Sequence, residues 1–352
     1  KCNHCYASGG TKADNELNTE ELLNVIDQFI ESGALNFDFL GGEPFMRTDL
    51  TALIERCIER GIHVNVTTNG TKLSRAWLDK FDKKLGLLRI ALDSVDPEKH
   101  DSFRGVQGAW AETIKGIRSA VERGVNVTVV TTFHRRNVHE LDQLVDFMLE
   151  LGVNAYANTI LLPSGRGAQL NEDVLSPSEL RAFCLAWGQK RSKLQEKKLP
   201  LALIDEHPLT TLLTSEKGYE GQHYQVNERL SKGRACTAGF IQAHMTPSGH
   251  LIPCGGMEGI SELHTDDNDV RKRSVNEIWM NSWIFRAMRD RMYQDRPFSI
   301  IDKCKECKYL PFCGGGCHAA SYLKYGDFYH TDPQCWYDPE GEGDIHDRNF
   351  NI

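Results

Sequence analysis

The sequence lacks the features that would mark a membrane, secreted or nucleic-acid-binding protein. No apolar run approaches the roughly 18 residues of a membrane-spanning helix. The first residues lack the basic-then-apolar order of a signal peptide. Basic side chains are not in excess, since 41 Lys and Arg stand against 49 Asp and Glu, for a net charge of -8. Nonspecific binding to a phosphate backbone needs a basic surface. We therefore expect a cytoplasmic protein that binds neither membrane nor nucleic acid.

Internal repeats and low-complexity tracts are absent too, and what remains is the composition of a large globular enzyme. The chain has 352 residues, of which 40% are hydrophobic, so it can bury a core and form one large or two ordinary domains. It also has 11 cysteines. In a small secreted chain these would form a disulfide framework, but in a large chain without a signal peptide the expected use is metal binding.

Four of the cysteines lie in one short stretch, Cys304-Lys-Glu-Cys-Lys-Tyr-Leu-Pro-Phe-Cys313-Gly-Gly-Gly-Cys317. Its glycines and Pro311 interrupt both the helix and the strand periods, so we predict a loop that holds a bound group. Thiolates at this spacing select zinc or iron-sulfur clusters. Cys236, Cys254 and Cys335 bring the set to seven, which overfills one zinc site and falls one short of the eight ligands of two four-iron clusters.

The order of these cysteines resembles the SPASM domain of radical S-adenosylmethionine (AdoMet) enzymes. The pattern is Cys236, twelve residues, Gly249, four residues, Cys254, a gap, Cys-x2-Cys-x5-Cys-x3-Cys, a gap, and Cys335. The resemblance implies two auxiliary 4Fe-4S clusters. The outer cluster would be held by Cys304, Cys307, Cys313 and Cys335, and the inner cluster by Cys236, Cys254 and Cys317.

The inner set departs from the fully ligated form of this family. Some members have a further cysteine shortly after the first, whereas residues 237–253 contain none. The resemblance then implies an open iron, which a substrate atom, a water or a side chain such as His244 could fill. A pair of zinc sites is the alternative, because ligand type alone does not separate the two metals.

A second cysteine motif, Lys1-Cys2-Asn-His4-Cys5-Tyr6, begins the chain. It resembles the end of the radical AdoMet signature Cys-x3-Cys-x-(aromatic)-Cys, with His4 at the aromatic position and the first cysteine lying before Lys1. The resemblance implies that Cys2 and Cys5 bind the catalytic 4Fe-4S cluster. Three thiolates leave the fourth iron free for the amino and carboxylate groups of AdoMet. Taken alone, Cys-x2-Cys is equally typical of half a zinc knuckle.

Between these motifs, hydrophobic periodicity alternates between helices and short apolar strands. We expect strands at 36–40, 63–66, 88–92, 125–132 and 156–162, and helices at 19–32, 50–60, 109–123 and 139–151. This alternation predicts an α/β protein built from parallel βα units. The resemblance makes it a partial (βα)6 radical AdoMet barrel, with the first strand before Lys1, followed by a small Cys-rich iron-sulfur domain.

The same reasoning divides the chain into three parts. The barrel is expected over residues 1–168, a helical bridging region over 169–232, and the SPASM domain over 233–352. Residues 199–232 are less regular and are expected to connect the barrel to the cluster domain. The acidic, glycine-rich tail after residue 337 is expected to be mobile.

Loops at the ends of the expected strands are candidates for binding AdoMet. In Gly41-Gly42-Glu43-Pro44, the glycines allow close backbone approach and the carboxylate can accept hydrogen bonds from an ammonium group. By resemblance this is the Gly-Gly-Glu motif that receives the AdoMet amino group. Thr68-Asn69-Gly70 ends the next strand, where the family often contacts the ribose or methionyl portion. A plain strand-to-helix turn is the alternative for Asn69.

Two further residues follow the third expected strand. Arg104 suits bidentate binding of a carboxylate, and Ser94 can hydrogen-bond a ribose hydroxyl. The alternatives are a surface arginine for Arg104 and a helix-capping serine for Ser94.

The loop Gly165-Arg166-Gly167 resembles one found in several SPASM subfamilies, although turn-forming residues alone would give the same sequence. Cys57 and Cys184 lie among apolar residues of helices and are predicted to be buried packing residues.

The resemblance implies a mechanism. AdoMet is cleaved to methionine and a 5'-deoxyadenosyl radical, which takes a hydrogen from an unactivated substrate carbon. Auxiliary clusters suit removal of an electron afterwards, so a net two-electron oxidation is expected. A low-potential donor such as flavodoxin or ferredoxin would supply electrons. The sequence identifies no catalytic acid or base.

Three functions remain open from the sequence. The leading hypothesis is oxidative modification of a ribosomally made precursor peptide, by a C–S or C–C cross-link. The alternative is oxidative decarboxylation of a siroheme-derived tetrapyrrole, because enzymes of that kind share the Cys-x-His-Cys-Tyr start and the Gly-Arg-Gly loop. The third is a noncatalytic redox or zinc scaffold.

Overall fold

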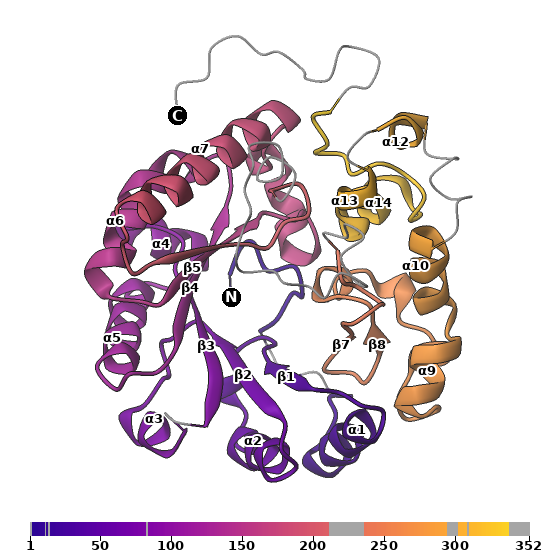
Figure 1. The fold of residues 1–352 in the computed structure, drawn as a ribbon. Helices are drawn as coiled ribbons and strands as arrows, with labels where there is room; N and C mark the ends of the chain where they lie inside the picture. Colours follow the sequence, from indigo (N-terminus) through magenta and orange to yellow (C-terminus); the bar gives the residue numbers. More distant parts are fainter. Residues whose placement is uncertain are drawn as a thin grey trace.

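A parallel sheet with helices on its outer side organises the molecule (Figure 1). The computed structural model describes residues 2–10, 12, 15–81, 84–210, 236–293, 302–307 and 310–337. The acidic tail after residue 337 and residues 211–232 of the expected bridging region lie outside the described residues. The sheet has six strands in the order β1 to β6, and every neighbouring pair is parallel. The strands are β1 Asn36–Phe39, β2 His63–Thr68, β3 Leu85–Ala91, β4 Val127–Phe133, β5 Ala155–Ile160 and β6 Ala202–Asp205.

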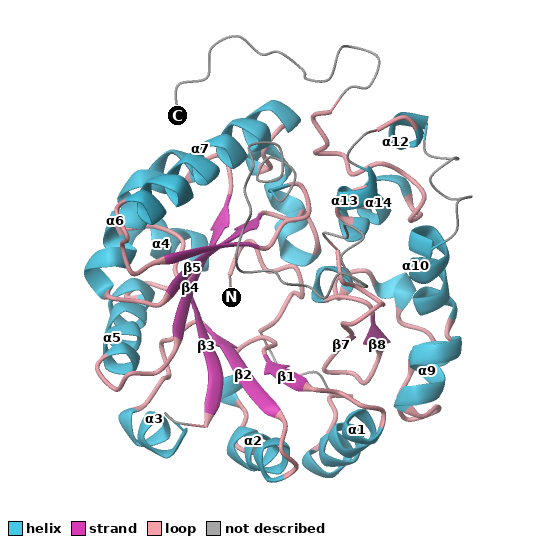
Figure 2. Ribbon diagram, viewed as in Figure 1, coloured by secondary structure: helices cyan, strands magenta, loops and turns pink. Residues whose placement is uncertain are grey.

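The α/β alternation expected from the sequence is confirmed. Figure 2 shows the helices outside the strands, while the N-terminal loop lies within the curve of the sheet. The helices of this region are α1 Thr19–Glu31, α2 Leu50–Glu59, α3 Arg75–Phe81, α4 Pro97–Arg104, α5 Ala109–Val121, α6 Leu141–Leu151 and α7 Pro177–Glu196. The start of α7 carries a capping box, in which the Ser176 side chain accepts from Glu179 N and the Glu179 side chain accepts from the Ser176 backbone.

Side chains of one face of each strand pack against these helices. Val66 in β2, Ile90 in β3 and Val129 in β4 are fully buried, and they share a core with Ile54 of α2 and Ile117 of α5. Fully burying an apolar side chain of this size contributes about 1.5–3 kcal/mol. Because successive side chains of a strand point to opposite faces, the alternate positions face the concave side of the sheet.

The sixth strand was missed by the sequence analysis, which expected an irregular segment there. β6 pairs with β5, matching Ala155 with Ala202 and Asn158 with Asp205. The signal is the short run Leu201-Ala-Leu-Ile-Asp205 after Pro200, which is typical of a buried strand but too short to stand out from a loop.

The cysteine-rich region lies on the other side of β1 (Figure 1). It contains the antiparallel pair β7 His244–Met245 and β8 Leu251–Ile252. Its helices are α9 Val275–Asn281, α10 Trp283–Tyr293, α12 Asp302–Lys305, α13 Leu310–Cys313 and α14 His318–Tyr325. The prediction of an unbroken loop over 304–317 was therefore wrong in part, because α12 and α13 are single helical turns. Pro311 is compatible with α13 because it stands in the first turn, where its missing N–H has no acceptor to lose.

The sheet and the cysteine-rich region share their cores. Val25 of α1 is buried in the core formed by Ile252, Ile278 and Phe285, while Trp336 near the end of the described chain is buried in the core of the sheet. This packing fixes the cysteine-rich region against the open edge of the sheet.

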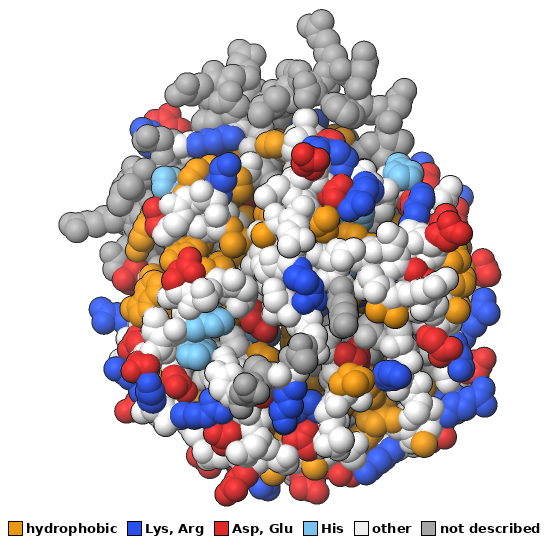
Figure 3. Space-filling view, turned by 180° about the vertical axis from the view of Figure 1, so that it is seen from behind, with side chains coloured by type: hydrophobic (Ala, Val, Ile, Leu, Met, Phe, Trp, Pro, Cys, Tyr) orange, Lys and Arg blue, Asp and Glu red, His pale blue; other side chains and the backbone are white. Residues whose placement is uncertain are grey.

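The surface agrees with the charge expected from the composition. Figure 3 shows acidic and basic side chains interspersed over the face opposite to that of Figure 1. No helix within the described residues is long and apolar enough to cross a membrane.

Candidate active site

The N-terminal cysteine loop lies inside the curve of the sheet and is held there by backbone contacts (Figure 1). Asn3 N donates to the Phe103 carbonyl of α4 at 3.1 Å. Arg166 binds the loop twice, because its backbone N donates to the Cys5 carbonyl at 3.0 Å and its Nε donates to the Cys2 carbonyl at 2.9 Å. The Gly-Arg-Gly loop therefore packs directly on the N-terminal cysteine loop.

Glycines make this close approach possible. Gly165 has a φ of 55°, and a Cβ at this position would overlap the carbonyl oxygen of Tyr6. Gly259 packs against the same carbonyl from the cysteine-rich region. Any larger residue at either position would push the cysteine loop away from its place.

The Gly-Gly-Glu loop touches the cysteine loop directly. A Cβ on Gly9 would lie 2.9 Å from Gly42 Cα and 3.8 Å from Cys5 Sγ. Gly41 has a φ of 124° and open space beside it, since no atom lies within 4 Å of the position a Cβ would take. A backbone that a ligand can approach closely therefore belongs to the loop that packs against Gly9, next to Cys5.

Glu43 is fixed in this loop by three hydrogen bonds. Its carboxylate accepts from Thr68 Oγ1 at 2.7 Å, from Asn69 N at 2.9 Å and from Phe45 N at 3.2 Å. Burial raises the pKa of Glu43, and these hydrogen bonds oppose that shift. The two carboxylate oxygens of Glu43 can accept about four hydrogen bonds in total, so they can accept one more from a donor such as an ammonium group.

Asn69 contributes through its backbone more than through its side chain. The Asn69 side-chain oxygen accepts from Thr71 N at 2.8 Å and from Thr71 Oγ1 at 2.7 Å, which closes a turn. Its backbone N binds Glu43. The geometry therefore favours the turn interpretation of Asn69 and gives it an indirect place at the site.

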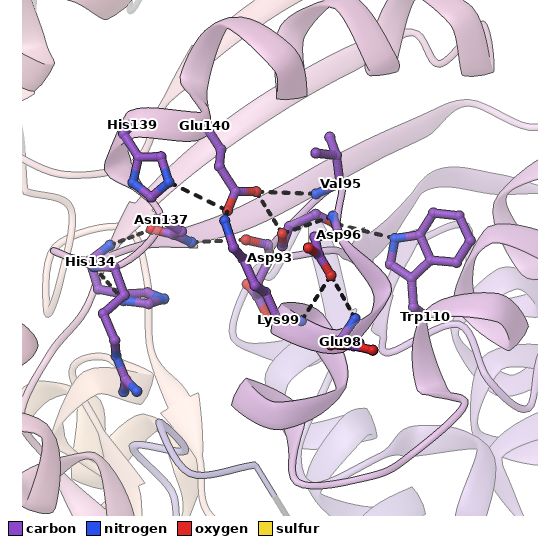
Figure 4. Close-up of polar contacts among 12 residues, drawn as sticks. Asp93, Val95, Asp96, Glu98, Lys99, Trp110, His134, Asn137, His139 and Glu140 are labelled. Atoms are coloured by element: carbon purple, nitrogen blue, oxygen red, sulfur yellow. Dashed lines mark hydrogen bonds and ion pairs between the residues drawn. The ribbon is translucent and has the colours of Figure 1, made fainter.

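Ser94 does not face a ligand as expected. Its hydroxyl is buried and donates to Glu140 Oε2 at 2.6 Å, and it accepts from Asp96 N at 3.0 Å. Figure 4 shows Glu140 at the centre of this network, where it also binds Val95 and Lys99. The hydroxyl is used within the protein, so the structure does not support the ribose contact predicted for Ser94.

Arg104 binds a carboxylate of the protein itself. Its Nε donates to Asp93 Oδ2 at 2.6 Å, and its Nη1 lies 3.9 Å from Cys2 Sγ. Burial opposes ionisation of Asp93, but Arg104 beside it lowers the Asp93 pKa to about 2. The alternative of a surface arginine is excluded because the Arg104 side chain is only 11% exposed. The structure thus places a positive charge beside a candidate cluster thiolate.

His4 forms part of an aromatic stack under this site. Its ring lies 4.0 Å from Phe103, whose ring lies 4.2 Å from His134. Burial, helped by Arg104, lowers the pKa of His4 to about 3, so its ring is neutral. The neutral His4 ring therefore packs the N-terminal cysteine loop against Phe103 and excludes water from this contact.

The cysteines proposed for the outer cluster come together in space. One cavity is lined by all four of them, together with Lys303 and Thr331 among others. Cys304 Sγ lies 3.2 Å from Thr331 Oγ1, and the Lys303 ammonium donates to the Cys335 carbonyl at 3.0 Å. The four are Cys304, Cys307, Cys313 and Cys335.

The three cysteines proposed for the inner cluster form a second group. Burial raises the pKa of Cys254 to about 12, and Cys236 beside it adds to the shift. Burial and the nearby Asp332, Cys254 and Cys236 also raise the pKa of Cys317. The seven thiols therefore form two groups in space, and their assignment as ligands of two clusters, which the resemblance implied, stays a prediction.

Asp332 lies between the two cysteine groups and was missed by the sequence analysis. It is buried, and its carboxylate accepts from Cys317 N and from Gln334 N, each at 2.8 Å. It also contributes to the raised pKa of both Cys313 and Cys317. No local signal marks it, since an aspartate in a polar loop is usually exposed.

His244, proposed for an open iron, is already paired. Its Nε2 lies 2.7 Å from Glu258 Oε2, and its Nδ1 lies 3.4 Å from the position of a Cβ on Gly255. The Tyr6 hydroxyl lies 3.2 Å from that same position. The N-terminal cysteine loop and the Cys254 loop thus meet at Gly255, with His244 beside them.

Cys57 and Cys184 are packing residues, as predicted. Both are buried in the core of the sheet, and burial raises the pKa of each thiol. Neither is suited to bind a metal.

The donor set and the space fit AdoMet and iron-sulfur clusters. The Cys5 thiol lies beside Gly9, which packs against the Gly-Gly-Glu loop, and the positive charge of Arg104 lies next to Cys2. Among the residues that the structure describes, no three His, Cys, Asp or Glu side chains converge on a single-ion site. Thiolates of a four-iron cluster bind separate irons and stand farther apart than the ligands of one zinc ion, so the four-thiol cavity favours a cluster.

Comparisons with known proteins agree with this geometry. Residues 1–148 match the radical SAM superfamily. The chain is 29% identical to an AdoMet-dependent heme synthase of Methanosarcina barkeri, over 96% of this chain and 93% of that protein. It is 27% identical to a PqqA peptide cyclase of Granulibacter bethesdensis, over 93% and 81% of the two chains.

The fold also has close counterparts among solved structures. The SuiB protein of Streptococcus suis, bound to its precursor peptide SuiA, superposes with a TM-score of 0.74 over 94% of this chain and 72% of that chain. Its sequence identity is 17%, so this likeness concerns the fold alone.

Proposed function

This chain is a radical SAM enzyme, and we propose that it oxidatively decarboxylates propionate side chains of a siroheme-derived iron tetrapyrrole. The observation that carries this proposal is the extent of the alignment to the heme synthase, which covers the sheet and the cysteine-rich region together. Each propionate would lose one hydrogen atom, one electron and carbon dioxide and become a vinyl group.

The residues at the edge of the sheet suit the first part of this reaction. Cys2 and Cys5 would hold the catalytic cluster, and Glu43 would accept a hydrogen bond from the AdoMet amino group. When bound, this pair of cofactors supplies a 5'-deoxyadenosyl radical that removes one hydrogen atom from the substrate. Arg104 offsets negative charge at Cys2, and the stacked ring of His4 excludes water from below.

The cysteine-rich region suits removal of an electron from the oxidised substrate. We propose that its two cysteine groups hold two auxiliary 4Fe-4S clusters, as in SPASM domains. The contact between Tyr6 and the Gly255 position brings the inner group next to the N-terminal cysteine loop. A short path between the two regions supports electron transfer between them. A flavodoxin or ferredoxin is the proposed external donor.

A ribosomally made peptide is the second candidate substrate. The relatives named PqqA peptide cyclase support it, because one of them is 27% identical over 93% of this chain. In that case the same residues would serve a C–S or C–C cross-link, and the substrate would lose two hydrogens without losing carbon dioxide.

Mass spectrometry of one reaction separates the two candidates. Anaerobically reconstituted protein is incubated with AdoMet, dithionite and either Fe-coproporphyrin III or the small peptide encoded nearest to its gene. We expect 5'-deoxyadenosine together with a tetrapyrrole that has lost carbon dioxide and two hydrogens per reacted propionate. An unchanged tetrapyrrole beside a peptide that has lost two hydrogens would replace the first candidate with the second.

A further inference from the structure

A charged pair lies on the concave side of the sheet, where neither the cysteine motifs nor the AdoMet loops account for it. Arg89 of β3 stands between Leu88 and Ile90, which are fully buried against the helices. Because side chains alternate along a strand, Arg89 points to the opposite face, into the curve of the sheet.

The row of residues around Arg89 is small. In the parallel pairing, Arg89 is matched with Thr67 on β2 and with Thr128 on β4. The same row continues to Ala155 on β5 and Ala202 on β6. Paired residues of neighbouring strands point to the same face, so one long cationic side chain rises from a floor of Thr and Ala.

The partner of Arg89 is Glu206, which directly follows β6. The two residues form an ion pair, and their side chains are 25% and 22% exposed. β4 and β5 separate β3 from β6 in the sheet, so the pair spans the concave interior. Asp205 is matched with Asn158, so Glu206 follows at the level of Thr159, which pairs with Thr132.

This level is that of the candidate active site. Thr132 N donates to Asp93 Oδ1 at 3.0 Å, and Asp93 binds Arg104, whose Nη1 approaches Cys2 Sγ. The intervening row has Ala91 on β3, Val130 on β4, Ala157 on β5 and Ile204 on β6, and the ion pair shows that the Arg89 side chain reaches past this row to Glu206. The register therefore places Glu206, and with it the guanidinium of Arg89, on the concave side at the level of Thr132, whose backbone N binds Asp93.

We propose that Arg89 is a substrate-binding residue that takes a carboxylate of the substrate in the concave interior, in exchange for Glu206. Glu206 holds the guanidinium in position until a carboxylate of the substrate replaces it. Arginine binds a carboxylate bidentately, which would fix the orientation of the reacting side chain. The inference rests on the proposed function for the identity of the substrate, because a propionate and an acidic peptide side chain present the same group.

A neighbouring ion pair shows what a purely structural pair looks like in this protein. Asp205 binds Arg191 of α7 at 2.5 Å, and these side chains are 13% and 10% exposed. Asp205 lies on the helix-facing side of β6, one residue before Glu206. It thus provides a matched control, since the two pairs have the same chemistry and differ in the face of the sheet.

Binding of Fe-coproporphyrin III and of its tetramethyl ester, followed by the shift of the Soret band, tests the inference in the reconstituted holoenzyme. We expect Arg89→Met to weaken binding of the acid by about 10- to 100-fold while leaving the ester unchanged, because a charge-assisted hydrogen bond is lost. Arg89→Lys should recover part of the loss, and Glu206→Gln should strengthen binding of the acid. Arg191→Met should change neither probe.

A second pair of probes identifies the source of the carboxylate. The small peptide encoded nearest to the gene is compared with a version in which each Asp and Glu is replaced by its amide, using tryptophan fluorescence. Dependence on Arg89 with the acidic peptide alone would place a peptide carboxylate there, and dependence with the porphyrin would place a propionate.

The outcomes separate the inference from the proposed function. If Arg89→Met weakens acid and ester equally, or no more than Arg191→Met does, Arg89 is structural and the inference is overturned. Binding that depends on Arg89 but gives no decarboxylated product overturns the proposed function and leaves the inference standing. Failure of the unmodified protein to bind either acidic probe overturns both.

Discussion

His207 Nε2 lies 4.0 Å from Asp332 Oδ2, and this contact joins the end of the sheet to the cysteine-rich region. His207 is the last of three consecutive residues with different partners. Asp205 binds Arg191 of α7, Glu206 binds Arg89 of β3, and His207 faces Asp332. The end of β6, a strand that the sequence analysis did not predict, thereby contacts the outer helices, the concave interior and the cysteine-rich region.

The first prediction concerns Asp332. Replacing it with Asn keeps the size but leaves one of the two backbone donors, Cys317 N or Gln334 N, facing an amide N–H group. An unsatisfied buried donor costs about 1–3 kcal/mol, so Asp332→Asn should lower the free energy of unfolding by this amount. Urea denaturation measures it. The exposed Asp146→Asn serves as control, and an equal effect of both would show that the hydrogen bonds of Asp332 contribute nothing.

The second prediction concerns the space around Tyr6. A Cβ on Gly259 would overlap the Tyr6 carbonyl oxygen and lie 2.6 Å from Ser164 Oγ. Gly259→Ala should therefore destabilise the protein by about 1–3 kcal/mol, as overpacking does. Gly188, within α7, has no atom within 4 Å of a new Cβ.

Gly188→Ala is the matched control for that change. Alanine is favoured over glycine inside a helix by about 0.5–1 kcal/mol, so this substitution should stabilise the protein. Denaturant midpoints of the two variants should move in opposite directions. If Gly259→Ala left the stability unchanged, the backbone around Gly259 could shift to accommodate the methyl group without loss of free energy.

The third prediction is a pH dependence that arises from His100. It is buried, its Nδ1 accepts from Asp93 N at 3.1 Å, and burial lowers its pKa from 6.5 to about 4. The unfolded chain then binds the proton more readily, so stability is full above pH 6.5 and falls as the pH drops towards 4. At 1.36 kcal/mol per pH unit, the loss between pH 6.5 and 5 is about 2 kcal/mol.

Replacing His100 with Asn isolates this effect. The Asn side-chain oxygen can accept from Asp93 N but does not titrate. The free energies of unfolding at pH 7 and pH 5, obtained from urea denaturation, should therefore differ less in His100→Asn than in the unmodified protein, by about 2 kcal/mol. His134 titrates in both proteins and cancels from the comparison. Equal pH dependence in the two proteins would assign the acid sensitivity to other groups.

The fourth prediction tests the division of the cysteines. Cys304→Ala should remove roughly four irons and the matching sulfide from the anaerobically reconstituted protein, because one thiolate of the proposed outer cluster is lost. The radical SAM and inner clusters should remain. Cys184→Ala, which removes a thiol of similar burial from the core of the sheet, should leave the iron content unchanged. Zinc without iron in the unmodified protein would contradict the cluster assignment.

Much of the fold could be predicted because its signal is local and repeated. Five apolar strands and the four helices expected at 19–32, 50–60, 109–123 and 139–151 could be predicted from hydrophobic periodicity. β6 was not predicted because a strand of four residues is too short to show a clear hydrophobic periodicity. Ser94 and Arg104 were placed at the right edge of the sheet, but their partners, Glu140 and Asp93, come from elsewhere in the chain and cannot be read from spacing.

The sequence by itself determined the two cysteine motifs, the Gly-Gly-Glu loop and the succession of strands and helices, because each depends on residue type and short-range spacing. Only the tertiary structure decided which side chains are already satisfied within the protein and which groups stand across the interior from each other. Arg89 and Glu206 are separated by more than a hundred residues in the chain and by two strands in the sheet. Their contact exists because the sheet curves, and curvature arises from the twist and packing of all its strands together.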